Sequence, residues 1–484
     1  MEKSVNLKPL TGLFDLFIDL STIERWNDFP RPIRFSELDK QAHKSIIALI
    51  LGKIEEHKKN NSNLDWEFLI SGLMFESLQR GIFKDIKPDI YNIFLKDKRI
   101  SFDKKTLEYF SEEKYLTEKD FPLVFKNFTK YIENRNCIEE RIIRASHLIS
   151  TIWEFELICK ITPDFINAQI VKEKHNHMLE QYLDLEGVKQ FFLSKGLKRS
   201  IDLIGQLRFQ KRWSQTPRIP ATTVLGHMFF VSSLIYFIIN LAINTKGIDS
   251  NKQKLYKLWK KNINHMFWAG LLHDMLELFT RDIITPVKNL LDDVFKNEEN
   301  SWKKSLEEYE SYKLNEFLET IPDYLEDEIK FLLGRINFKI PKREGTDKYD
   351  KEFSMRVLKN VKNKFTAILI SEEKKLISYL DDENSYVIDG RLIKFSDLLS
   401  ALLEASYSVF NFGIKSKHLI KGLDNLTKPF VESKTSKSTN KNLKSLSNEL
   451  NLDLKPMWKD LGVKYKDLEE KLREIRKGFI SKTL

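Results

Sequence analysis

Two histidines and two aspartates in the second half of the chain could together bind a metal ion. His273 and Asp274 are adjacent in the stretch 271–288, where acids and a histidine interrupt an apolar helical stripe. A packed core normally excludes such polar groups unless something compensates them. With His227 and Asp397, the pair offers two imidazoles and two carboxylates. Such a set can hold one divalent cation and leave positions open for water and a phosphate oxygen.

These ligands must come from three helices. Neighbouring residues leave a helix about 100° apart, so the adjacent histidine and aspartate reach one ion only at the edge of their helix. His227 and Asp397 each lie in an apolar-periodic segment of their own. We choose Asp397 over the aspartates within 381–389 because the latter stretch has the pattern of a polar loop, whereas 395–404 has that of a helix.

The residues after the His-Asp pair extend the pattern. Glu277 lies one helical turn after His273 on the same face, where an acid or base could act beside the ion. The run His-Asp-x-x-Glu-x-x-x-x-Asp-x-x-x-Pro-x-Lys, with His227 and Asp397, resembles the HD-domain phosphohydrolase superfamily, all-helical enzymes that cleave phosphate esters. Within that superfamily, the run is most similar to the deoxynucleoside 5'-monophosphatase branch.

The resemblance implies a role for each matching residue. The metal ligands would be His227, His273, Asp274 and Asp397, with Glu277 helping to activate the attacking water and Asp282 assisting proton transfer at the leaving group. Upstream, Arg212-Trp213 with Pro217-Arg218 resembles the family's Arg-Trp segment that contacts nucleotide. Arg212 and Arg218 would then bind phosphate, and Trp213 would stack on the nucleoside or form a wall beside it. One difference is that the chain has Gly226-His227-Met228 where the family has Glu-His-Ser.

The first third of the sequence resembles a degenerate copy of the same region. Arg25-Trp26 with Pro30-Arg31 repeats the spacing of Arg212-Trp213 with Pro217-Arg218. The alignment pairs His43 with His227 after a three-residue difference in loop length, Phe75 with His273, Glu76 with Asp274, Gln79 with Glu277, Lys84 with Asp282 and His147 with Asp397. Because phenylalanine offers no lone pair and lysine replaces an acid, we expect this copy to bind no metal.

Composition favours an all-α fold, and the chain is long enough for the tandem duplication that the internal alignment indicates. The 484 residues are 42% hydrophobic, enough for two cores, and they include only 17 Gly and 13 Pro, with no Val/Thr-rich alternation typical of sheets. The expected organisation is a degenerate copy at 10–160, a helical connector at 161–200, an active domain at 201–425, a polar linker at 432–445 and a C-terminal helical piece at 446–484. A charged, helix-patterned insertion near 295–385 would lengthen the active domain, as a lid or as a peripheral decoration.

The sequence predicts a cytoplasmic protein. The stretch 224–243 is uncharged and long enough to span a membrane, but it contains His227, two serines and an asparagine. We therefore expect a buried central helix and no membrane partner. The N-terminus lacks a signal-peptide pattern, and Cys137 and Cys159 are too few for a disulfide framework, which favours a reducing compartment.

Three functions are compatible with these features. The first is hydrolysis of a phosphomonoester, a nucleoside 5'-monophosphate, with one Mn, Co, Fe, Ni or Mg ion as cofactor. The second keeps the chemistry but acts on a phosphodiester, either single-stranded nucleic acid or a cyclic or oligomeric nucleotide, in keeping with a net charge of +10. The third is a non-catalytic nucleotide-binding scaffold. The sequence leaves the base, the metal and the oligomeric state open.

Overall fold

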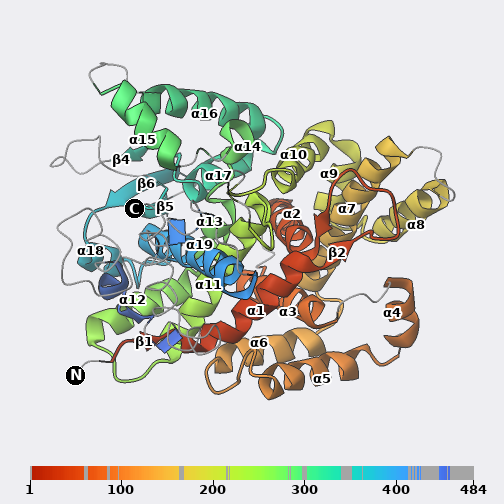
Figure 1. Ribbon diagram of the computed structural model, residues 1–484, viewed down its shortest axis with the longest axis horizontal. Coiled ribbons are helices and arrows are strands. Elements are labelled where there is room, and N and C mark those ends of the chain that lie inside the picture. The colour runs from red at the N-terminus through yellow and green to blue at the C-terminus, as the bar shows by residue number, and fades with distance from the viewer. Residues whose placement is uncertain are drawn as a thin grey trace, which may run out of the picture.

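Helices dominate the computed structural model, which is 70% helical and confirms the predicted all-α class. The structure describes residues 3–58, 64–83, 88–95, 97–162, 168–213, 218–281, 285–296, 302–339, 352–361, 364–412 and 446–454, together with a few isolated positions. Helix α11 (Val224–Asn244) lies at the centre, and helices from both halves of the chain surround it (Figure 1).

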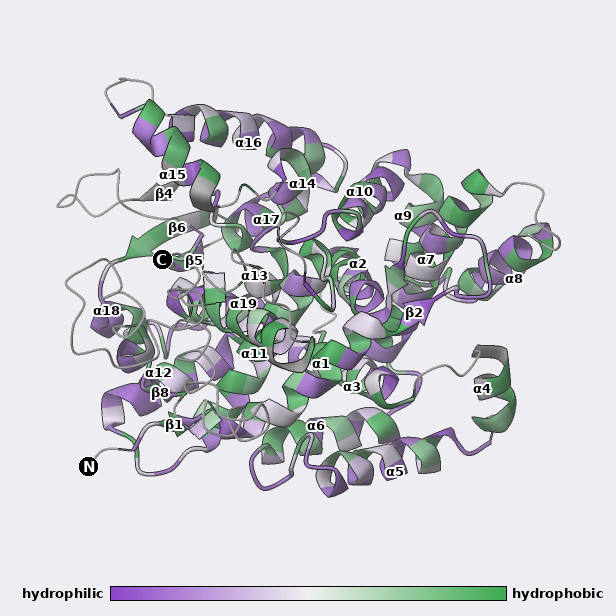
Figure 2. Ribbon diagram, viewed as in Figure 1, coloured by the Kyte–Doolittle hydropathy of each residue, from purple (hydrophilic) through white to green (hydrophobic). Residues whose placement is uncertain are grey.

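The central helix is apolar because it is enclosed. Thr223 caps α11 by accepting a hydrogen bond from the Gly226 amide at 3.0 Å. By length and composition the helix could cross a membrane, yet its most apolar window is 100% buried inside the protein. The predicted buried central helix is therefore confirmed. Figure 2 shows apolar residues along the elements that pack together there, and polar residues on peripheral helices.

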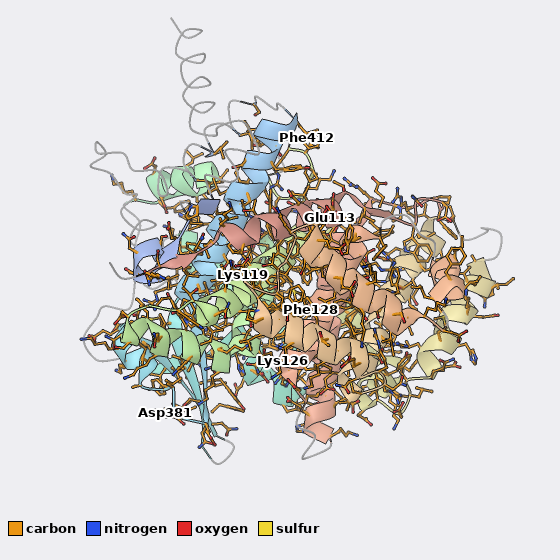
Figure 3. All side chains as sticks on the ribbon, turned by 90° about the horizontal axis from the view of Figure 1, so that it is seen from below. Glu113, Lys119, Lys126, Phe128, Asp381 and Phe412 are labelled. Carbon is orange, nitrogen blue, oxygen red and sulfur yellow. The ribbon has the colours of Figure 1, made fainter. Side chains whose placement is uncertain are left out.

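The N-terminal region packs α2 against α11. Its elements are β1 (Val5–Asn6), η1 (Lys8–Leu10), α1 (Thr11–Thr22), β2 (Glu24–Arg25), β3 (Phe35–Ser36), α2 (Glu37–Lys58), α3 (Trp66–Ile82), α4 (Pro88–Leu95), α5 (Arg99–Glu112), α6 (Pro122–Glu133) and α7 (Ile138–Ile161). Helix α2 lies between α7 and α11. Buried apolar residues of both halves form one continuous core, and Phe128 of α6 lies within it (Figure 3).

A short helical connector leads into the second half. It consists of α8 (Ala168–Glu180), α9 (Glu186–Leu193), α10 (Lys195–Gly205) and η2 (Gln206–Arg208). After α11, the chain forms α12 (Ser250–Lys261), α13 (Ile263–Leu272), α14 (Glu277–Thr280) and α15 (Thr285–Val294), and it later returns to the core in α19 (Gly390–Phe412). Helices α13 and α19 both pack on α11, which brings the segments with the predicted ligands together.

The insertion near 295–385 is only partly helical, so the expectation of helix there is wrong for its second part. It begins with α16 (Trp302–Leu318), η3 (Asp323–Leu325) and α17 (Glu326–Leu332), and it continues with β4 (Phe338–Lys339), β5 (Met355–Val361), β6 (Lys364–Ile370), α18 (Glu373–Ile377) and β7 (Ser385–Asp389). The four strands form one sheet in the order β4-β6-β5-β7. Strands β5 and β6 pair antiparallel, and their β-branched and aromatic residues suit a half-buried sheet surface.

The C-terminal piece folds back onto the N-terminus. Strand β8 (Leu452–Asp453) pairs in parallel with β1, with Val5 opposite Leu452. The predicted linker at 432–445 and most of the predicted helical piece lie outside the described residues. In Figure 3, Phe412 marks the end of α19 and Asp381 the outer edge of the β-sheet insertion.

A buried ion cluster joins the two halves. Glu154 of α7 accepts hydrogen bonds from Arg25, at 3.0 Å from Nε, and from Arg208 of η2. The indole of Trp26 donates to the same carboxylate at 2.8 Å. Burial alone would raise the pKa of Glu154, but Arg25 and Arg208 outweigh it and hold the pKa below its usual range. The carboxylate is therefore ionised and compensates the buried guanidinium of Arg208 and the partly buried guanidinium of Arg25.

We expect Glu154→Gln to lower the free energy of unfolding by about 3 kcal/mol, because it leaves the buried Arg208 and the partly buried Arg25 without their shared partner. Since the folded-state pKa is lowered, this stabilisation is present at neutral pH and is lost as the pH falls through the acid range. Urea denaturation at several pH values would measure both effects. The control is Glu108→Gln, which breaks only an exposed pair with Lys105. Equal shifts in the two variants would contradict the structural role of Glu154.

Candidate metal centre

His227 lies in the first turn of α11, with both ring nitrogens held in place. The capping residue Thr223 starts the helix, and His227 follows four residues later with its side chain fully buried. Its Nδ1 lies 3.1 Å from the Ser400 hydroxyl, and its Nε2 lies 3.0 Å from Asp397 Oδ1. The hydroxyl thus orients the ring so that Nε2 points toward Asp397, as outer partners of metal-binding histidines do.

His273 lies where α13 ends, and it presents one nitrogen to the centre. Its Nδ1 donates to the Gly270 carbonyl at 2.8 Å, which leaves Nε2 as the atom that can bind a metal once it has lost its proton. The Nε2 atom is buried and makes no hydrogen bond of good geometry, although Asp274 Oδ2 lies 3.3 Å away. A buried nitrogen directed at neighbouring ligand atoms fits a metal ligand.

The structure brings all four predicted ligands together. His227, His273 and Asp397 offer ligand atoms within 4.8 Å of one another. Asp274 Oδ2 lies 3.8 Å from His227 Nε2, so its carboxylate borders the same centre. These residues come from α11, the end of α13 and α19, as the requirement for three converging helices predicted. Among the described residues, no second group of this kind is found.

The charges of the centre are strongly coupled. Burial opposes protonation of His273, but Asp274 and Asp397 outweigh it and raise the pKa of His273 to about 10. Burial and Arg212 lower the pKa of His227. Burial alone would raise the pKa of Asp397, but the neighbouring imidazoles lower it. The cluster of two carboxylates thus attracts positive charge, and a divalent cation would meet that demand.

Arg212 reaches the centre, whereas Arg218 does not. Lys211 pairs with Thr223 in an antiparallel bridge, which puts Arg212 beside the start of α11. Its Nη1 lies 3.1 Å from Asp274 Oδ2. Arg218 is buried and donates instead to Glu404 and Thr222. The structure therefore places Arg212 beside the ligands and Arg218 in a separate buried pair.

Trp213 forms part of a wall next to this segment. It adopts a positive φ of 56°, and its ring packs against a small apolar cluster that includes Leu402, Val409 and Leu423. The guanidinium carbon of Arg218 lies 5.7 Å from the Trp213 ring centroid. Because the Trp213 ring is packed against these residues, it is better suited to form a wall beside the centre than to stack freely on a nucleoside.

Of the two predicted proton-transfer residues, Glu277 and Asp282, only Glu277 lies among the described residues. Glu277 begins α14, just after the turn that carries Asp274, and its carboxylate interacts electrostatically with Arg212. It is therefore close enough to Arg212 for the two charges to interact. Asp282 lies outside the described residues.

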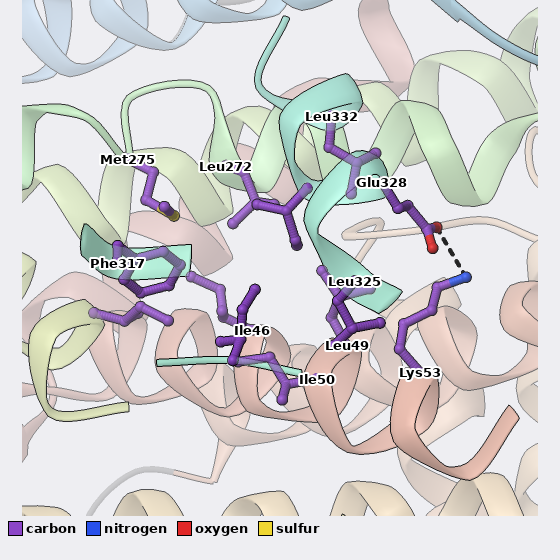
Figure 4. A pocket seen from close by; sticks show the side chains of 13 residues that line it. Ile46, Leu49, Ile50, Lys53, Leu272, Met275, Phe317, Leu325, Glu328 and Leu332 are labelled. Carbon is purple, nitrogen blue, oxygen red and sulfur yellow. Dashed lines mark ion pairs between the residues drawn. The ribbon is translucent and has the colours of Figure 1, made fainter. Parts of the chain in front are cut away.

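An apolar pocket lies behind the turn that carries His273 and Asp274. Leu272 and Met275, which flank the pair, line it together with Ile46 and Ile50 of α2 (Figure 4). At one end, Lys53 of α2 forms an ion pair of 2.9 Å with Glu328 of α17. The N-terminal half thus supports the turn from behind.

Sequence reasoning missed several residues around the centre. Ser400 and Glu404 follow Asp397 at helical spacing in an apolar segment, so their polarity was a usable signal. Phe353 has its ring centroid 6.5 Å from that of His273, and the charge of Glu352 contributes to the raised pKa of His273. These two residues lie just before β5 in the insertion, far from the motif in sequence, and nothing in their spacing pointed to the centre.

Comparison with known proteins supports the HD-domain superfamily. Residues 204–353 match the family model of the HD domain. The matched segment includes His227, His273, Asp274 and Glu277, and it ends before Asp397. No curated protein and no solved structure matches the chain.

We expect His273→Ala, and separately Asp274→Ala, to abolish binding of a divalent metal while the helical fold is kept. Each change removes one ligand, and the remaining three leave the ion too weakly held. Metal content after dialysis, with circular dichroism as the test of folding, would measure the effect. His177→Ala, which changes an exposed histidine on α8, is the control. A variant that retains a stoichiometric metal would contradict the assigned ligands.

Proposed function

We propose that this protein is a metal-dependent phosphohydrolase of the HD type. The observation that carries the proposal is the convergence of the buried His227 and His273 with the partly buried Asp397 within 4.8 Å, with Asp274 beside them. The HD-domain match over 204–353 supports the same class. A divalent cation bound there would polarise phosphate oxygens and lower the pKa of a water molecule.

The chain's own residues have distinct tasks in this proposal. His227 and His273 hold the ion through Nε2, because the opposite nitrogens are occupied by Ser400 and the Gly270 carbonyl. Arg212 orients Asp274 and adds positive charge where a phosphate would lie. Glu277 accepts the proton of the attacking water, and Asp282 assists proton transfer to the leaving group.

For the substrate, we propose a phosphomonoester of the nucleoside 5'-monophosphate class. The run from His273 to Lys288 and the Arg212-Trp213 pair support it. The net charge of +10 supports a phosphodiester as the second candidate. Two imidazole ligands favour Mn, Co, Fe or Ni over Mg, since Mg prefers an all-oxygen environment. The cytoplasm is the proposed compartment, in keeping with the free thiols Cys137 and Cys159.

A substrate panel tests the proposed function. The full chain is stripped with a chelator, reloaded with each metal in turn, and assayed with nucleoside 5'-monophosphates, cyclic nucleotides and labelled single-stranded oligonucleotides. Release of inorganic phosphate from the monophosphates, absent in His273→Ala, supports the proposal. Cleavage of the oligonucleotides or cyclic nucleotides alone supports the phosphodiesterase alternative. Tight nucleotide binding without turnover under any metal supports the scaffold and overturns the enzyme.

We expect Glu277→Gln to reduce turnover by about 100-fold or more while metal stays bound, because the amide keeps the shape but cannot accept a proton. Steady-state rates together with metal content would check this. Glu319→Gln, which changes an exposed acid directly after α16, serves as the matched control. Loss of the metal from Glu277→Gln would instead make this residue a ligand.

A further inference from the structure

Two hairpins of the same length introduce α2 and α11. In the first, β2 pairs with β3, and Glu24 lies opposite Ser36. In the second, Lys211 lies opposite Thr223. Each hairpin has a tryptophan with positive φ two residues after the first bridge position, 55° at Trp26 and 56° at Trp213. A bulky residue in this conformation is uncommon, so its repetition at equal spacing indicates a shared local frame.

The helices that close the two frames also correspond. His147 of α7 and Asp397 of α19 are each followed seven residues later by a buried glutamate, Glu154 and Glu404. Each glutamate accepts hydrogen bonds from an arginine of its own hairpin segment, although from different positions of it: Arg25 directly follows the first bridge position, and Arg218 comes seven residues after it. The same arrangement of hairpin, capped helix and closing helix thus occurs twice.

The common register corrects one detail of the sequence alignment. Ser36 accepts from the Asp39 amide as Thr223 accepts from the Gly226 amide, so the caps correspond. Lys40 lies four residues after the cap Ser36, and His227 lies four residues after the cap Thr223. The two hairpins are equally long, so the expected three-residue difference in loop length does not occur. Lys40 donates to Thr151 of α7, whereas His43 lies a turn further on, 3.1 Å from the Ile201 carbonyl. Pairing His43 with His227 is therefore wrong.

We infer that residues 24–154 are a second copy of the site frame, and that this copy positions His227 through Asp39. In the copy, Lys40 and Phe75 stand where the two imidazoles stand in the active half. Asp39 Oδ1 accepts a hydrogen bond from the Thr223 hydroxyl, while Oδ2 accepts from the Ser36 hydroxyl at 2.7 Å. One buried carboxylate therefore joins the caps of α2 and α11.

Gly226 shows how closely the two copies meet. A Cβ atom at this position would lie 2.8 Å from Asp39 Oδ1 and 3.2 Å from a Leu38 methyl carbon, so a side chain has no room. The resembling HD pattern has glutamate at this place. Here the space beside His227 is filled by a carboxylate from the other copy, which accounts for the departure of Gly226-His227 from that pattern.

Asp39 acts on His227 through the capping residue. The Thr223 hydroxyl donates to Asp39 and accepts from the Gly226 amide, and the Thr223 carbonyl accepts from the His227 amide at 3.1 Å. Without Asp39, the hydroxyl loses the partner that fixes its rotamer, and the first turn of α11 loosens. Asp39 is thus a positioning residue for the proposed metal centre, and this inference rests on that proposed function.

The test compares Asp39→Ala with Asp39→Asn in the full chain. The asparagine keeps an oxygen that accepts from Thr223, whereas alanine removes it. We expect Mn²⁺ affinity to fall by about 10-fold or more in Asp39→Ala and to stay near that of the unchanged protein in Asp39→Asn, as for outer partners of metal ligands. The matched control is Asp103→Ala, which removes another buried carboxylate of the copy, one that accepts a hydrogen bond from Gln79 and pairs with Arg99 and Arg135. It should lower the melting temperature and leave Mn²⁺ affinity unchanged.

Hydrogen exchange of the amides at 226–228 in the metal-free protein provides a readout that does not depend on the proposed function. Faster exchange in Asp39→Ala than in Asp103→Ala supports the positioning role, even if the chain proves to hydrolyse nothing. Unchanged Mn²⁺ affinity and exchange in Asp39→Ala, or equal weakening by Asp103→Ala, would overturn it. If Asp39→Ala does not fold, the same contact is tested from the Thr223 side. Thr223→Val removes the hydroxyl that donates to Asp39, and Thr223→Ser keeps it. We expect Thr223→Val to weaken Mn²⁺ binding and speed exchange as Asp39→Ala would, and unchanged values in Thr223→Val would overturn the positioning role.

Discussion

The structure depends on placing two buried imidazoles beside two partly buried carboxylates at the border of an apolar core. Such groups are costly to bury unless each has a partner, and here the partners are one another. His227 meets Asp397 at 3.0 Å, and Asp274 meets His273 at 3.3 Å and Arg212 at 3.1 Å. This requirement fixes the relative positions of α11, the end of α13 and α19. A helix that shifted by one residue would leave a buried charge without compensation.

The apolar surroundings serve the same requirement. Helix α11 is buried along its length, so His227 cannot exchange its partners for water. Apolar side chains that line the pocket, among them Leu272 and Met275, pack the turn of His273 against α2. The ion pair between Lys53 and Glu328 lies at one end of this contact. The N-terminal half therefore forms one core with the half that carries the ligands. Removing it would expose the face of α11 on which α2 packs.

Much of the centre could be predicted from the sequence because its residues break a pattern. Histidine and acids within apolar helical stripes are conspicuous, and their order along the chain matched a known arrangement. The structure brings His227, His273, Asp274 and Asp397 together, with Glu277 and Arg212 beside them. The same reasoning could not show that Arg212 reaches the centre and Arg218 does not, because both arginines belong to the same Arg-Trp segment. Only the fold shows that Glu404 and Thr222 occupy Arg218.

Other features depend on contacts that no local pattern reveals. The strands of the insertion lie within a charged stretch, and a sheet is stabilised by cross-strand neighbours that are distant in sequence. The predicted pairing of His43 with His227 rested on both residues being histidine. The residue that occupies the first turn of a helix is instead decided by where the helix cap lies. Once the caps of α2 and α11 are aligned, Lys40 takes that place, and Asp39 lies between the two helix starts. In the proposed duplication, a copy without the ligands is still required, because the space left by Gly226 is filled by its carboxylate.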